Sequence, residues 1–77
     1  PQAVVKMVIH FHDKKINLKN LLFVEDCYLV LNSQTVHVKC EAGYEQQVVN
    51  QLPDWVRNNY EVVRQTGWVM IMFGLNL

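Results

Sequence analysis

The sequence predicts a small α+β domain, built from a mainly antiparallel sheet with helices on one of its faces. Two stretches, 27–40 and 60–73, each hold two apolar-rich segments separated by a short polar turn, which is typical of β-hairpins. Between them, 44–58 has apolar residues at intervals of three and four, which is typical of an amphipathic helix. With a strand and a short helix before them, these segments fit a β-α-β-β-α-β core of the split βαβ type, in which a hairpin takes the place of the last strand. A small α+β roll with another strand order is the alternative.

The first element is predicted to be a half-buried strand over 3–11. Apolar residues alternate along "AVVKMVIHF", so that Val5, Met7, Ile9 and Phe11 share one face. The other face of this strand carries Lys6 and the histidines that follow it. Polar residues at 12–15 then end the alternating pattern.

The second element is predicted to be a short helix in "NLKNLLFV". Leu18, Leu21 and Leu22 stand at i, i+3 and i+4, and Asn17 precedes them as an N-cap. A strand over 15–18 is the alternative, because Ile16 and Leu18 also alternate. We favour the helix.

The third element is a hairpin over 27–32 and 35–40, with Ser33 and Gln34 as its turn. This register places Cys27 directly opposite Cys40 on the inner face, where a cross-strand disulfide can form. Two reduced cysteines packed as small apolar residues are the alternative, which we favour. The turn lacks the Asn-Gly pair that fixes a hairpin register.

The fourth element is an amphipathic helix over 44–58. Pro53 lies inside this pattern and removes a backbone donor, so it either kinks the helix or begins a second short one at its N1 position. The adjacent residues Asn58 and Asn59 are suited to end the helix.

The last element is a hairpin that turns at Thr66 and Gly67, since glycine accepts the positive φ of a tight turn. This register gives one strand face Val62 and Ile71, and gives the other face Glu61 and Gln65, whose burial would be costly. The face with Ile71 is therefore predicted to be the inner one. The outward face is then also rich in apolar residues, namely Val63, Trp68, Met70 and Met72.

Composition argues against several functional classes. The 77 residues allow a single domain, 1–77, and the formal net charge is zero, which removes the global electrostatic argument for nucleic acid. The longest apolar run has six residues, Trp68 to Phe73, far short of the ~20 that a transmembrane helix needs. No nucleophile elbow, glycine-rich phosphate loop or separated carboxylate pair is present, so we expect no enzyme, no catalytic residue and no cofactor. The three histidines, 10, 12 and 37, lack a fourth ligand at a suitable spacing, so no metal site is expected.

Two binding hypotheses follow. The first is a protein-interaction or self-associating module that uses the outward face of the C-terminal strand, because Met and Trp favour interfaces and a large apolar patch requires a cover. The alternative is that a terminal segment or a second helix layer of the same chain covers this apolar patch. The second hypothesis is a single-stranded RNA- or DNA-binding module, which combines positive charge with aromatic rings. Its candidate residues are Lys6, His10, His12, Lys14, Lys15, His37 and Lys39, with Tyr28 and Trp68 beside them.

Overall fold

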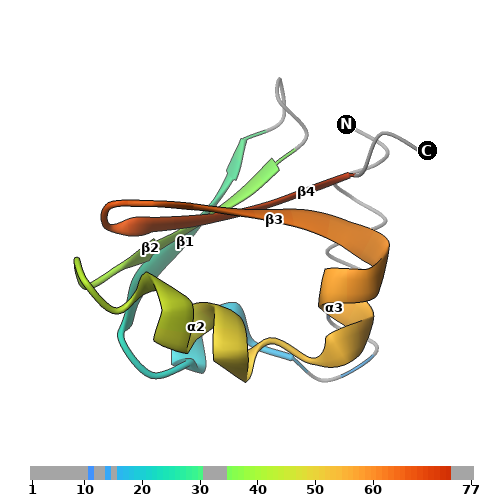
Figure 1. Cartoon of the computed structure of the whole chain (residues 1–77), viewed down its shortest axis with the longest axis horizontal. Coiled ribbons are helices and arrows are strands. Elements are labelled where there is room, and N and C mark those ends of the chain that lie inside the picture. The colour runs from blue at the N-terminus through green and yellow to red at the C-terminus, as the bar shows by residue number, and fades with distance from the viewer. Residues whose placement is uncertain (1–10, 12–13, 15, 31–34, 74–77) are drawn as a thin grey trace.

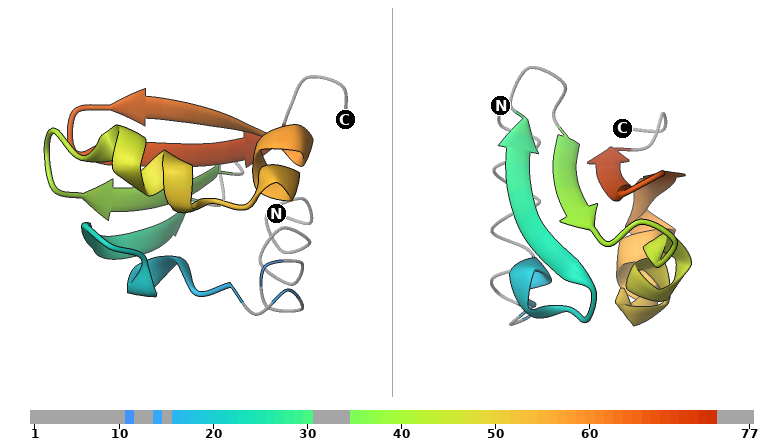
Figure 2. Two further views of the ribbon diagram at one scale, coloured as in Figure 1. Left: turned by 60° about the horizontal axis from the view of Figure 1, so that its bottom comes forward. Right: turned by 90° about the vertical axis from the view of Figure 1, so that its left-hand side faces the viewer.

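The computed structural model describes residues 11, 14, 16–30 and 35–73, and it shows a small α+β architecture (Figure 1). The described strands are β1 (Val24–Val30), β2 (Thr35–Cys40), β3 (Tyr60–Gln65) and β4 (Trp68–Phe73). They form one antiparallel sheet in the order β1-β2-β4-β3 (Figure 2). Helices α2 (Glu45–Gln51) and α3 (Asp54–Asn59) both lie below this sheet in Figure 1.

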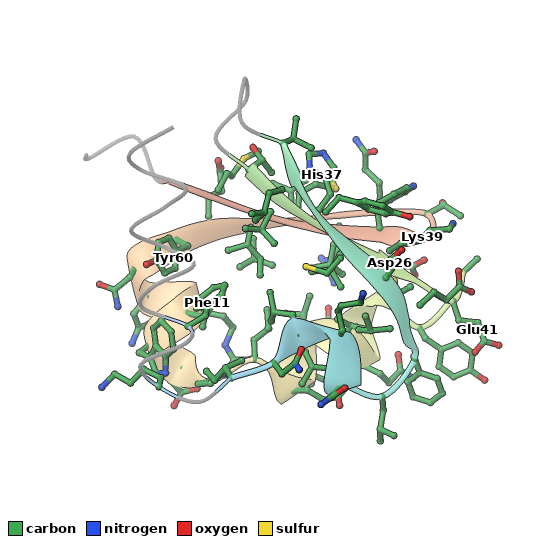
Figure 3. All side chains as sticks on the ribbon, turned by 180° about the vertical axis from the view of Figure 1, so that it is seen from behind. Phe11, Asp26, His37, Lys39, Glu41 and Tyr60 are labelled. Carbon is green, nitrogen blue, oxygen red and sulfur yellow. The ribbon has the colours of Figure 1, made fainter. Side chains whose placement is uncertain are left out.

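The core lies between the sheet and the two helices. Alternate residues of β2 and β4 point into it, and α2 and α3 contribute Val48 and Val56, both fully buried. Phe11 closes one end, with its ring edge against Trp55 and Tyr60 at centroid distances of 5.4 and 5.8 Å. Figure 3 shows Phe11 and Tyr60 together at that end of the sheet.

The predicted helix over 44–58 is two short helices. Pro53 has φ −61° and ψ 155° and is the N-cap of α3, so the chain leaves helical geometry at Leu52 and Pro53. The predicted second short helix is therefore present, with Pro53 as its N-cap instead of at its N1 position. The missing N–H of a proline is tolerated here because a helix start leaves that donor without an intrahelical acceptor anyway.

The segment before β1 forms a single turn of 3-10 helix, Leu18–Asn20, rather than a strand. Asn17 is its N-cap, and its side-chain oxygen accepts a hydrogen bond from the Lys19 N–H at 3.1 Å. The predicted helix and its cap are therefore present in shortened form. Leu18 anchors the turn because its side chain is buried in the core.

The predicted first strand, 3–11, lies outside the described residues except for Phe11, whose backbone is helical. The split βαβ prediction required that strand beside β2. This placement is wrong, because β1 and β4 occupy the two edges of β2. The described elements run 3-10 helix, β1, β2, α2, α3, β3 and β4, which agrees with the α+β class but not with the predicted strand order.

Candidate functional site: the outer face of the sheet

The sheet has a second face, turned away from α2 and α3, which we call the outer face. The register of the terminal hairpin is the predicted one, with Val62 opposite Ile71 and Val63 opposite Met70. Ile71 is fully buried in the core, so the odd-numbered positions of β4 point inward and the even-numbered ones outward. The apolar and aromatic residues of the outer face are Tyr28, Val30, His37, Val63, Trp68, Met70 and Met72.

Three aromatic rings and one ammonium group gather on this face over β2. Tyr28 on β1 and Trp68 on β4 approach across β2, with ring centroids 6.1 Å apart. The His37 ring lies edge-on to Trp68 at 6.0 Å, and Lys39 Nζ lies 5.2 Å from the same indole, a cation–π contact. His37 and Lys39 are labelled on this side in Figure 3. Sequence reasoning placed Tyr28 only at the margin of this site, although the alternation along β1 already put it on this face.

Met70 does not have the exposure expected of it. Its side chain is on the outer face, as the register predicts, but only 6% of it is exposed, whereas Met72 is partly exposed. Strand β4 is central in the sheet, so Met70 has His37 on one neighbouring strand and Val63 on the other. The expectation that Met70 is an accessible contact residue is therefore wrong. The exposed apolar surface lies nearer the β1 edge than predicted, where Tyr28 is 45% and Val30 36% exposed.

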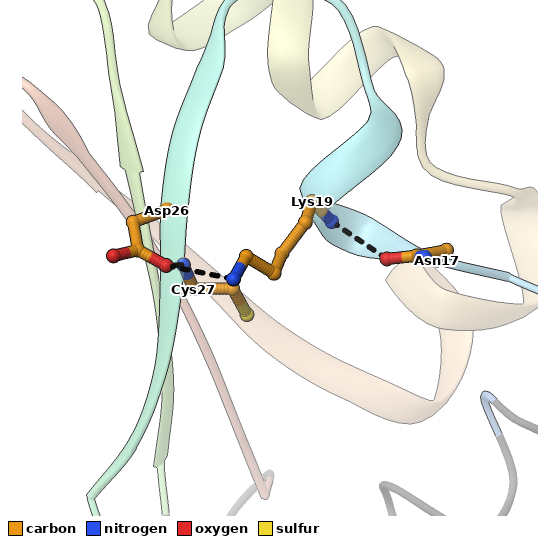
Figure 4. A network of polar contacts seen from close by, with 4 residues as sticks. All are labelled: Asn17, Lys19, Asp26 and Cys27. Carbon is orange, nitrogen blue, oxygen red and sulfur yellow. Dashed lines mark hydrogen bonds and ion pairs between the residues drawn. The ribbon is translucent and has the colours of Figure 1, made fainter.

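Two carboxylates of strand β1, Glu25 and Asp26, are paired with lysines within the molecule. Lys39 Nζ lies 3.7 Å from the Glu25 carboxylate, and Lys19 Nζ lies 3.3 Å from that of Asp26. The Cys27 N–H donates to Asp26 Oδ1 at 2.8 Å (Figure 4). This backbone hydrogen bond, then one with Tyr28, holds the pKa of Asp26 below its usual value, and the pKa of Tyr28 is raised by the same contact.

His37 has one ring nitrogen, Nδ1, that is buried without a hydrogen-bond partner in the described part of the chain. A buried polar atom of this kind costs free energy unless it is satisfied. His37 as a whole is partly exposed, and its ring lies edge-on to that of Trp68.

The residues proposed for nucleic-acid binding are not assembled by the described structure. Lys6, His10, His12 and Lys15 lie outside the described residues, and Lys14 is exposed in a turn before the 3-10 helix. Of the candidate set, His37 and Lys39 are brought together, on neighbouring outward positions of β2. Because β1 and β4 pair with the two edges of β2, no further strand can pair with β2, as the predicted row of basic residues required.

The two cysteines share the inner face but are not partners in the hairpin. Cys27 is opposite Val38, and Cys40 is opposite Val24, so the predicted register of the first hairpin is wrong by two residues. Both thiols are free, and burial is the main cause that raises the pKa of each.

An apolar pocket of about 360 Å³ opens between the 3-10 helix and β1. The pocket is lined by Phe11, Ile16, Asn17, Leu18, Lys19, Cys27, Leu29 and Val36.

Among the residues 11, 14, 16–30 and 35–73, no group of three His, Cys, Asp or Glu side chains is placed to hold a metal ion. No helix within these ranges is long and apolar enough to cross a membrane.

No protein-family model matches the chain, and neither the curated proteins nor the solved structures compared with it give a match.

Proposed function

We propose that this domain is a protein-interaction module that acts by binding rather than by catalysis, and that its outer face associates with the same face of a second copy. The observation that carries this proposal is the apolar and aromatic surface on the side of the sheet opposite the core. Tyr28 is 45% exposed and Val30 36%, while Trp68, Met72 and Val63 are partly exposed beside them. Aromatic residues and Met are enriched in protein interfaces because they bury much area and adapt to a partner's shape.

The charge pattern supports a protein partner over a polyanion. Lys39 is paired with Glu25, Lys19 is paired with Asp26, and Glu61 adds a negative charge on the same face. Among the described outward positions of the sheet, the carboxylates of Asp26 and Glu61 outnumber the one lysine, Lys39, which does not favour a phosphate backbone. A second copy would meet a nearly neutral surface, so like charges would not prevent the two faces from packing together.

Light scattering over a concentration series tests this proposal. We expect the mass to rise from that of the 9.0-kDa monomer toward twice that value, with little response to added salt, because apolar contacts do not depend on charge screening. Met72→Lys should weaken association. Gln47→Lys, an equivalent change at an exposed site on α2, should leave it intact. A monomer at every concentration would overturn the proposal of self-association.

Single-stranded RNA or DNA is the second candidate, favoured by one observation. Tyr28, His37 and Trp68 form a group of rings with Lys39 beside them, and bases stack on such rings. Fluorescence anisotropy with a labelled single-stranded oligonucleotide tests it. Binding that weakens steeply with salt and is removed by Trp68→Ala would support this function. Absence of binding at low salt would exclude it.

A further inference from the structure

A second exposed apolar surface lies away from the outer face, where two turns of the chain meet. The first turn, 22–23, precedes β1, and the second, 42–43, precedes α2. Their flanking rings, Phe23 and Tyr44, are stacked with centroids 4.1 Å apart and planes inclined by 21°. Both rings remain more than one-third exposed, and Leu22 beside them is 69% exposed. We call Leu22, Phe23, Glu41 and Tyr44 the corner.

The corner is held in one conformation by hydrogen bonds from elsewhere in the chain. The side chain of Gln51 on α2 clamps Leu22, accepting from its N–H at 2.8 Å and donating to its carbonyl at 3.0 Å. The Glu41 N–H donates to the Phe23 carbonyl at 3.0 Å, and the Tyr44 N–H donates to the Glu41 carbonyl at 3.1 Å. These bonds fix the two turns against each other, so a ligand would find the rings already in place.

Phe23 has φ of 68°, in the left-handed region that bulky side chains rarely adopt. Glycine would take this conformation without strain. The phenyl ring lies outside the buried core cluster and rests on Tyr44 at the surface. Strained residues of this kind concentrate at binding sites, where the surrounding structure holds them in place.

Of the four corner residues, Glu41 is the charged one. Its side chain is exposed, and its backbone is hydrogen-bonded to both Phe23 and Tyr44. Glu41 makes none of the ion pairs found among the described residues. Figure 3 shows it at the end of the molecule opposite Phe11 and Tyr60. The segment 41–45 carries Glu41 and Glu45 and no cation. An exposed aromatic pair on the same corner as a carboxylate without an ion pair is complementary to a planar cation.

We propose that the corner binds an arginine side chain presented by a partner protein. The guanidinium would stack on the exposed face of one ring and pair with the Glu41 carboxylate, while Leu22 would contact the aliphatic part of the arginine. Arginine suits this site better than lysine because its flat group can stack and form two parallel hydrogen bonds with one carboxylate. The corner shares no residue with the outer face, so this site does not depend on self-association.

NMR titration of the whole chain with the blocked peptide acetyl-Ala-Arg-Leu-Arg-Ala-amide tests this site. Backbone signals of 22–23 and 41–44 should shift, whereas those of Trp68 and Met72 should not. Replacing both arginines by citrulline, which keeps the shape and removes the charge, should weaken binding at least tenfold. Glu41→Gln should have a similar effect, while Glu61→Gln on β3 should have none.

Phe23→Gly provides a second variant that keeps the backbone conformation, since glycine adopts positive φ without strain. It should retain the fold by circular dichroism and lose at least fivefold in affinity for the arginine peptide. Three results would each overturn the proposal: no shifts at millimolar peptide, shifts confined to other surfaces, or equal binding of the citrulline peptide.

Discussion

Met70 and Met72 lie two residues apart on β4 and point to the same side of the sheet, yet their exposure differs. Met70 is 6% exposed between His37 and Val63, while Met72 is only partly buried. Alternation along the strand predicts the direction of each side chain. It does not predict burial on that side, which depends on what other parts of the chain pack against the side chain.

Met70→Ala should therefore destabilise the domain more than Met72→Ala. Removing a buried methionine side chain leaves a cavity and costs about 2–3 kcal/mol of unfolding free energy, whereas the half-exposed site should cost about 1 kcal/mol or less. Urea unfolding of the two variants measures the difference. Equal losses would show that Met70 is not buried as described.

Glu45 joins two turns through its carboxylate. It accepts from the Gly67 N–H at 2.6 Å and from the Gly43 N–H at 3.1 and 3.2 Å. The hydrogen bond from Gly67, followed by those from its own N–H and from Gly43, holds the pKa of Glu45 below its usual value. The charged form is therefore favoured in the folded state.

Because the folded-state pKa is lowered, the contribution of Glu45 to stability is present above the unfolded pKa of ~4.3 and is lost as the pH falls through the lower folded value. Glu45→Gln should lower the melting temperature at pH 7, and the difference from the unmodified chain should shrink below about pH 4. Glu61→Gln is the control, because Glu61 is exposed on β3. A difference that stays constant with pH would contradict this role.

The two hairpins show which sequence signals fix a register. In the β3–β4 hairpin, Gly67 has φ of 79° and takes the turn position that requires a positive angle, so the pairing could be predicted residue by residue. The polar link before β2 contains no glycine, and an irregularity between Val24 and Asp26 shifts the pairing further. Neither feature could be deduced from alternation, because a shift of two residues leaves the inner and outer sets unchanged.

Cys27 and Cys40 should therefore resist forming an intramolecular disulfide. Residues diagonal to each other across a hairpin have Cα atoms about 7–8 Å apart, beyond the usual range for a disulfide. Mild oxidation of the folded chain should leave both thiols detectable by mass spectrometry after alkylation. Rapid loss of two hydrogens from the monomer would contradict the observed register.

Cys27 should also be alkylated before Cys40, since it is partly exposed whereas Cys40 is 2% exposed.

At the scale of the whole molecule, the class of the fold could be predicted but the strand order could not. Periodicity identified the hairpins and the helical region correctly. Periodicity does not show which strand pairs with the second edge of β2, because it describes one strand at a time and not its neighbours. Strand β4 pairs with β2 through Val36 and Ile71, both essentially fully buried. Five of the six apolar residues from Trp68 to Phe73 have described side chains; two of these, Val69 and Ile71, belong to the core, and three belong to the outer face.

The indole N–H signals of the two tryptophans give the most direct test of the proposed interaction surface. Trp68 lies on the outer face beside Tyr28 and His37, whereas Trp55 lies on α3 against Phe11. In a ¹⁵N NMR dilution series from millimolar to micromolar protein, the Trp68 signal should move with concentration and the Trp55 signal should stay in place. A Trp55 signal that moves while Trp68 stays fixed, or two signals that never change, would contradict association through the outer face.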